Sequence, residues 1–323
     1  MRKELGMFIL LILLCVIITI FNHQFLSGAN IQNMSRVIGI YGIFSIGVGI
    51  VIITGGIDLS IGSVLALLGV LLSMMLTQWH LPVVLAVIAV IAMGVVLGAG
   101  HGLLVTGIRI QPFIVTLCGL LFYRGLARFI AQDETKGFGN GAGFGWLIRL
   151  ASGNVAGIPM PFILLVIISI IMWVILHRTV YGRYLFAIGR NEEAARYSGI
   201  NSRVIITSAY MISAGLTGIA SILLAFYTNS VSPSSHGNFY ELYAIAAAVL
   251  GGCSLRGGEG SIIGILIGTA LLQLLPNLVN LLGIPSSLDF AVMGAVILIG
   301  VIADEILKRR SKTTLKATAG AKN

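Results

Sequence analysis

Long apolar runs constrain this sequence more than any other feature. Of the 323 residues, 57% are hydrophobic and only 10% are charged. A helix needs about 20 mostly apolar residues to cross a membrane, and runs of about this length recur along most of the chain. Because soluble globular domains carry far more charge, this composition predicts an all-α, polytopic membrane protein.

The apolar runs predict about ten transmembrane helices. We expect them over residues 5–22, 36–54, 60–78, 83–107, 111–131, 161–177, 204–227, 239–252, 261–282 and 288–307. Eight crossings remain an alternative if the second and third runs, or the eighth and ninth, form re-entrant pairs. The run from 5 to 21 is long for a signal peptide, so we interpret it as an uncleaved first helix. A single transmembrane domain over 1–307 and a basic tail over 308–323 follow.

Positive charge sets the expected orientation of these helices. The net charge is +9, but the basic residues flank apolar runs, which indicates topology and no nucleic-acid partner. With both termini in the cytoplasm, all basic residues face inward except Arg36, Arg124, Arg128, Lys136 and Arg149. The glycine-rich stretch 132–160 then becomes an outer loop, with a short helix near Trp146.

The largest expected cytoplasmic loop spans residues 178–203. Five arginines and only two acids lie in it, namely Arg178, Arg183, Arg190, Arg196, Arg203, Glu192 and Glu193. Residues 191–197 (NEEAARY) predict a short helix with Asn191 as its N-cap, acids in its first turn and Gly199 as its C-terminal glycine. This helix has little apolar surface of its own, so we expect it to dock against another protein.

Glycines recur every fourth residue in two of the expected helices. The two series are Gly94, Gly98 and Gly102, and Gly260, Gly264 and Gly268. Such spacing allows helices to approach closely in lipid, so we expect a packing function for both series.

No catalytic motif is present in the sequence. No lysine follows a glycine, which excludes a nucleotide-binding P-loop, and no H-E-x-x-H zinc motif occurs. The histidines are scattered near helix ends, and we interpret them as interfacial polar residues. We therefore expect no metal, no directly bound cofactor and no ATPase site in this chain, so that any ATP-driven function requires a separate subunit.

Few ionisable residues fall near the expected membrane interior, where each one is a functional hypothesis. Asp58 either caps the following helix or faces a partner. Arg124 and Arg128 either extend outward to the membrane surface or line an outer mouth. Glu241 and Asp289 begin helices, with the outer mouth as their alternative location. No carboxylate lies clearly within a span, which argues against an ion-coupled carrier.

Neutral polar side chains are more frequent at membrane depth than ionisable ones. They are Thr116, Tyr123, Tyr210, Ser213, Gln273, Asn277 and Asn280. A pathway lined by neutral hydrogen-bonding groups and aromatic rings suits a sugar or polyol better than an ion, although polar residues also bridge helices. Our candidate pathway residues are Thr116, Tyr123, Arg124, Tyr210, Gln273 and Asn277.

Three stretches resemble the permease subunits of bacterial ABC sugar importers of the ribose, arabinose, xylose and galactoside type. The first is 54–63 (TGGIDLSIGS), a signature turn with Gly55, Gly56, Asp58 and Ser60. The second joins 182–191 (GRYLFAIGRN) to 194–200 (AARYSGI), and the third joins 247–252 (AAVLGG) to 260–264 (GSIIG). The chain departs from the family pattern at Arg256, where a small residue is expected.

The resemblance implies a permease with a type II importer-like fold in the bacterial cytoplasmic membrane. Its implied partners are a second permease subunit, identical or paralogous, two cytoplasmic ATPase subunits that use ATP, and an extracytoplasmic sugar-binding protein. Glu192, Glu193, Ala194, Ala195, Arg196 and Gly199 resemble the loop that couples such permeases to the ATPase. The alternative function is a stand-alone secondary carrier or channel for a small neutral solute.

Overall fold

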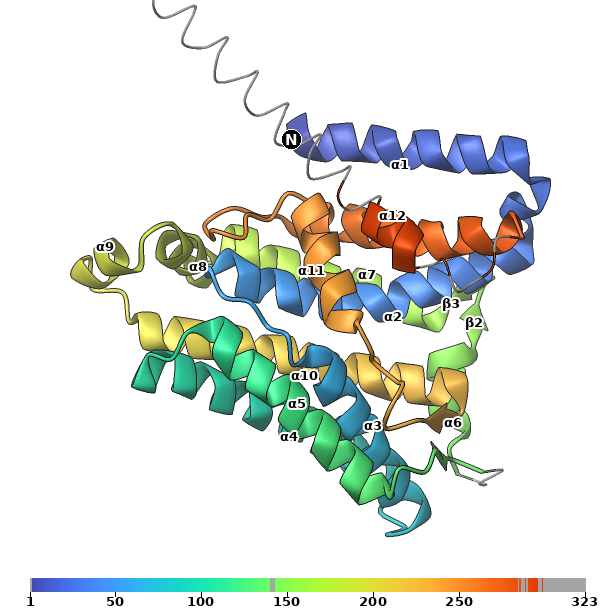
Figure 1. Ribbon diagram of the computed structural model, residues 1–323, viewed down its shortest axis with the longest axis horizontal. Helices are drawn as coiled ribbons and strands as arrows, with labels where there is room; N and C mark the ends of the chain where they lie inside the picture. Colours follow the sequence, from blue (N-terminus) through green and yellow to red (C-terminus); the bar gives the residue numbers. More distant parts are fainter. Residues whose placement is uncertain are drawn as a thin grey trace, which may run out of the picture.

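The computed structural model describes residues 2–139, 143–283, 285, 288, 290–295 and 298. These residues form a helical bundle with two very small antiparallel sheets (Figure 1). The α-helices are α1 (Arg2–Phe21), α2 (Gly28–Ile53), α3 (Ile61–Thr77), α4 (Val83–Leu103), α5 (Pro112–Ala131), α6 (Gly145–Ser152), α7 (Met160–Arg178), α8 (Val180–Arg190), α9 (Glu192–Tyr197), α10 (Ser202–Thr228), α11 (Tyr240–Leu250) and α12 (Ile262–Leu281). The smaller elements are the 3-10 helix η1 (His23–Leu26), the π-helix η2 (Leu104–Ile108), and the strands β1 (Lys136–Gly137), β2 (Asn154–Val155), β3 (Ile158–Pro159) and β4 (Ser230–Val231).

Seven helices in the described part of the chain are long and apolar enough to cross a membrane. They are α1, α2, α4 with its η2 extension, α5, α7, α10 and α12. The predicted spans over 60–78 and 239–252 correspond to α3 and α11, which have 17 and 11 residues. Helix α3 is at the lower limit of length for a crossing helix, and α11 is too short to cross alone. The predicted helix over 288–307 lies largely outside the described residues, as do Asp289 and the tail over 308–323.

Helices α2 and α10 form the centre of the bundle and run antiparallel. The Tyr227 hydroxyl, near the end of α10, donates to Asn33 Oδ1 near the start of α2 over 2.9 Å. Gly47 of α2 lies directly against Ser213 of α10, where an added Cβ would stand 2.7 Å from the Ser213 Cα. Figure 1 shows the two helices flanked by α1 and α12 on one side and by α3, α4 and α5 on the other.

Five of the six glycines in the two series pack helices closely, as the sequence predicts, whereas Gly260 precedes α12 and lies against Cys253 and Ile53. An added Cβ at Gly94 would lie 2.6 Å from the Ala214 carbonyl oxygen, and one at Gly98 would clash with the Tyr210 carbonyl. Gly264 and Gly268 likewise contact the backbone at Gly251 and Ala247. The first series therefore holds α4 against α10, and the second holds α12 against α11.

Helices α3 and α11 both begin inside the bundle. The Ser221 hydroxyl donates to the Leu65 carbonyl oxygen over 2.7 Å, which places the start of α3 beside the middle of α10. Tyr240, the first residue of α11, stacks its ring at 5.9 Å from that of Phe44 in α2. Because residues 54–60 return from the end of α2, and residues 229–239 return from the end of the antiparallel α10, the two short helices enter the interior from opposite ends (Figure 1).

The two ends of the bundle differ in their connections. The end that carries α9 also holds the turn after α2, η2 and residues 251–260, and we refer to it as the α9 end. The opposite end holds α6 and the two small sheets, in which β1 pairs with β4 and β2 with β3 (Figure 1). The short helix predicted near Trp146 is confirmed as α6.

Candidate functional site

Helix α9 forms where the sequence predicts it. Asn191 is its N-cap, and the side-chain oxygen accepts a hydrogen bond from the Ala194 amide over 2.9 Å. Gly199 follows with a φ of 84°, a left-handed conformation that glycine adopts without steric cost. The Ile200 amide then donates to the Ala195 carbonyl oxygen over 3.1 Å, which closes the helix.

Helix α8 is a feature that the sequence interpretation missed. The sequence predicts a loop over 178–203 with a helix only at 191–197, yet residues 180–190 form 11 residues of amphipathic helix with Leu185 and Ile188 buried. Thr179 is its N-cap, accepting from the Gly182 amide over 3.3 Å. The signal was present, because Tyr181, Leu185 and Ile188 recur at helical spacing on one face.

Helix α9 presents most of its side chains outward. Ala195 is buried, whereas Glu193, Arg196 and Tyr197 are exposed, and the exposed fraction of Tyr197 reaches 91%. Glu192 is tied back to the chain, because the Ser202 hydroxyl donates to its Oε1 over 2.9 Å. The exposed side chains of Glu193, Arg196 and Tyr197 are thus accessible to another molecule.

Three stretches far apart in sequence meet through glycines at the end of α8, the helix that precedes α9. An added Cβ at Gly257 would lie 2.7 Å from the Gly189 carbonyl oxygen and 2.8 Å from the Gly55 nitrogen. The Gly258 amide donates to the Ile53 carbonyl oxygen over 2.8 Å. The end of α2, the end of α8 and the turn before α12 therefore share a backbone contact, which we term the glycine junction (Gly55, Gly189, Gly257 and Gly258).

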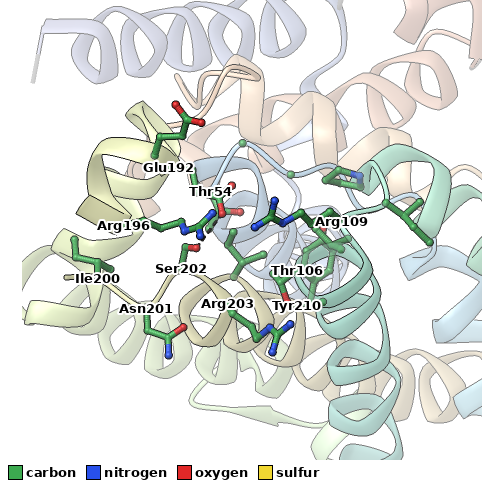
Figure 2. A pocket seen from close by; sticks show the side chains of 18 of the residues that line it. Thr54, Thr106, Arg109, Glu192, Arg196, Ile200, Asn201, Ser202, Arg203 and Tyr210 are labelled. Carbon is green, nitrogen blue, oxygen red and sulfur yellow. Dashed lines mark hydrogen bonds between the residues drawn. The ribbon is translucent and has the colours of Figure 1, made fainter. Parts of the chain in front are cut away.

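A cavity of about 920 Å³ lies between α9 and the body of the bundle. Its walls come from the turn after α2, the η2–α5 connection, α9 and the first turns of α10, and they include Gly55, Gly56, Arg109, Arg196 and Tyr210. Figure 2 shows Arg109 and Arg196 extending toward one another from opposite walls. The cavity therefore brings the predicted signature turn and the predicted coupling helix together.

A chain of buried polar side chains continues from the signature turn into the bundle. Asp58 Oδ1 accepts from the Ser60 amide over 2.9 Å and from the Ser60 hydroxyl over 2.6 Å. The Ser60 hydroxyl lies 3.4 Å from His101 Nδ1, and His101 Nε2 lies 3.1 Å from the Tyr123 hydroxyl. Asp58, Ser60 and His101 are at most 3% exposed, so α3, α4 and α5 are joined by polar contacts inside the bundle.

The sequence interpretation missed the position of His101. It placed all histidines at interfaces, whereas His101 is buried between partners that are 41 and 22 residues away along the chain. Asp58 and Glu241 are also buried, at 1% and 7% exposure, near the starts of α3 and α11. Neither carboxylate lies in the middle of a helix, but the bundle encloses both of them.

Three of the six candidate pathway residues surround this polar chain. Thr116 donates to the Ile57 carbonyl oxygen over 3.1 Å, and Tyr123 contacts His101. The Tyr210 hydroxyl is fully buried without a hydrogen-bond partner among the described residues. It stands 2.8 Å from the position of a Cβ at Gly56, between the cavity and the buried chain.

The other three candidates lie elsewhere. Arg124 donates to the carbonyl oxygens of Pro233 and His236 over 2.9 and 2.6 Å, so it holds the segment between β4 and α11. Gln273 lies beside Tyr41 and Tyr243, and Asn277 exchanges hydrogen bonds with Asn30.

Two further predictions concern Arg128, the second arginine of α5, and metal binding. Arg128 pairs with Asp133 at 2.6 Å, outside the buried chain. Within the described residues, no group of three or more histidine, cysteine or acidic side chains is placed to hold a metal ion.

Comparison with known proteins identifies the class. The family described as "Branched-chain amino acid transport system / permease component" matches residues 30–301. The chain belongs to this family, and it is a multi-pass membrane permease component of a transport system, not its ATPase.

The curated relatives are more specific. The chain is similar to the ribose import permease protein RbsC of Bacillus subtilis, with 41% identity covering 94% of this chain and 92% of the relative. It shares 38% identity with RbsC of Escherichia coli over 94% of each chain, and 32% with the xylose transport system permease protein XylH of E. coli, covering 89% and 87%. No solved structure shows a significant match to the chain.

Proposed function

We propose that the chain is the membrane permease of an ATP-driven ABC importer, and that it forms the translocation pathway for a monosaccharide such as ribose or xylose. The observation that carries this proposal is the capped, outward-facing helix α9, which follows the glycine junction at the end of α8. The names and near full-length coverage of the relatives support a sugar as substrate.

The proposed assembly has two permease subunits, identical or paralogous, two ATPase subunits and an extracytoplasmic sugar-binding protein. The α9 end faces the cytoplasm, consistent with the arginines of residues 178–203 and the positive-inside rule. The seven long helices, α3 and α11 with their extended return segments, and the predicted helix over 288–307 together make ten crossings. Both termini then lie inside. This topology supports a type II importer-like arrangement.

The glycine junction supplies a physical route for coupling. When two ATPase subunits close on ATP, a helix docked on them must move with them. Helix α8 contacts the end of α2 and the turn before α12 through unbranched backbone at Gly189, and it leads directly into α9. A displacement of α9 that moves α8 is therefore transmitted to two spans, and little of it is absorbed by side chains. We propose that Glu192, Glu193, Ala194, Ala195, Arg196 and Gly199 form this coupling element.

Substitutions in α9 test the proposal. Replacing Gly199 with a bulky residue forces a side chain into a φ of 84°, and Glu193→Lys reverses a charge on the exposed face. We expect both variants to insert normally into the membrane and to lose sugar uptake in cells that lack the native chain. Wild-type uptake with normal ATPase binding would contradict the mechanism.

A second candidate function is a stand-alone carrier for a small neutral solute. The buried carboxylates of Asp58 and Glu241 favour it, because ion-coupled carriers place acids at such depth. The near full-length similarity to import permeases makes the ABC function the better supported of the two.

A further inference from the structure

Two guanidinium groups converge in the cavity beside α9. Arg109 follows η2 and Arg196 belongs to α9, and their side chains extend toward one another from opposite walls (Figure 2). Arg109 has a φ of 63°, a left-handed conformation that is uncommon for a residue other than glycine. The backbone thus accepts a less favourable conformation at the position from which this arginine enters the cavity.

The charges of the cavity walls are not balanced by ion pairs. The charged lining residues are Arg109, Arg196, Arg203, Glu192 and Glu193. No ion pair in the described part of the chain joins any of the three arginines to a carboxylate, and Glu192 accepts a hydrogen bond from Ser202. Like charges that face one another in a concave site raise the local positive potential, which attracts an anion.

The chemistry of the walls indicates a carboxylate as that anion. A guanidinium donates two parallel hydrogen bonds to a carboxylate or a phosphate. Thr54, Gly55 and Ser202 also line the cavity and add backbone and hydroxyl groups that can hydrogen-bond to an anion. One wall is α9 itself, so a protein docked on α9 is adjacent to the opening.

We propose that this cavity receives an acidic side chain of the ATPase subunit, which Arg109 and Arg196 hold jointly. This inference rests on the proposed function and adds a second docking point to it, on the η2–α5 connection. The acid would connect α9 to the body of the permease, so that docking depends on the distance between the two walls and hence on the state of the transporter.

The test measures binding of the cognate ATPase to the full-length permease in nanodiscs made only of zwitterionic lipid. We expect Arg109→Gln and Arg196→Gln each to weaken binding about tenfold and to reduce its salt dependence. Arg183→Gln is the matched control, because Arg183 is exposed on α8 of the same loop and does not line the cavity. We expect it to change binding by less than about twofold.

The outcomes separate this inference from the proposed function. If the wild-type permease does not bind the ATPase, the proposed function fails and the inference fails with it. If the wild type binds and both glutamine variants bind equally well, only the inference is overturned. The inference would also be overturned if inorganic phosphate inhibited wild-type binding while no substitution of an acidic ATPase residue changed it. Recovery of Arg109→Glu binding by one acid-to-lysine substitution on the ATPase would support it.

Discussion

Gly62, in the first turn of α3, lies directly against the carboxylate of Glu241, in the first turn of α11. The amino ends of two oppositely directed helices therefore meet inside the bundle. Each amino end carries a partial positive charge, and the buried carboxylates of Asp58 and Glu241 place negative charge beside them. Discontinuous helices that meet at mid-membrane are a common basis for substrate passage in transporters.

Gly62→Ala is expected to destabilise the protein. Its Cβ would clash with Glu241 Oε2 and with the Gly237 carbonyl oxygen, and such overpacking costs about 1–3 kcal/mol. The thermal midpoint of the purified protein measures the effect. Gly125→Ala on α5 is the control, because nothing lies within 4 Å of its added Cβ; equal midpoints for the two variants would refute the contact.

His101 and Tyr123 are expected to be energetically coupled. Replacing His101 with Ala leaves the buried Tyr123 hydroxyl without its partner at 3.1 Å, so Tyr123→Phe should cost less in that background than in the wild type. A double-mutant cycle on unfolding free energy should give a coupling of about 0.5–2 kcal/mol. Strict additivity would show that the two rings are merely neighbours.

Asn191→Ala is expected to loosen α9. Loss of the cap on the Ala194 amide should reduce helix stability by about 1 kcal/mol. Hydrogen exchange at the amides of 194–197 should accelerate, and sugar uptake should fall with it. Asn191→Asp keeps an acceptor at the N-cap and should behave like the wild type, whereas faster exchange in that variant would mean that capping is not the cause.

A comparison of Gly257→Ala with Gly252→Ala distinguishes steric crowding from backbone strain. The two glycines have φ values of 82° and 92°, so both variants carry the same left-handed penalty of about 1–2 kcal/mol. Only Gly257 contacts Gly189 and Gly55; nothing lies within 4 Å of a Cβ at Gly252. We expect lower stability and lower uptake for Gly257→Ala than for Gly252→Ala, and similar values would remove the glycine junction from the mechanism.

Cys253 is expected to resist thiol reagents. Burial raises the pKa of its thiol to about 12, and only the thiolate reacts, so little reactive form exists near neutral pH. Maleimide labelling should be slow at pH 7 and should accelerate as the pH rises toward that pKa. Leu255→Cys, introduced into a Cys253→Ser background, is the exposed control, and comparable rates at pH 7 would show that the turn is open.

Local patterns in the sequence predicted what local physics determines. The helix at 191–197, with its cap Asn191 and Gly199, depends on hydrogen bonds within a few residues, and it formed as expected. The four-residue glycine spacing predicted close packing because helical geometry alone places those glycines on one face. The family resemblance added the permease class.

Long-range contacts escaped prediction. Nothing local to His101 indicates that Ser60 and Tyr123 surround it, and a sequence of apolar runs does not show that α3 and α11 begin in the interior. The burial of Asp58 and Glu241 follows from these interior helix starts and has no local signal in the sequence. Tertiary packing likewise decides which candidate pathway residues lie together. It groups Thr116, Tyr123 and Tyr210, and it places Arg124, Gln273 and Asn277 elsewhere.

The central claim is that this chain carries sugar only when a separate ATPase drives it through α9. The most direct measurement is uptake of radiolabelled ribose into proteoliposomes containing the permease, with the ATPase, the sugar-binding protein and ATP added in turn. We predict uptake only when all three are present, and loss of that uptake in Glu193→Lys. Ribose flux through the permease alone, with or without an ion gradient, would contradict it.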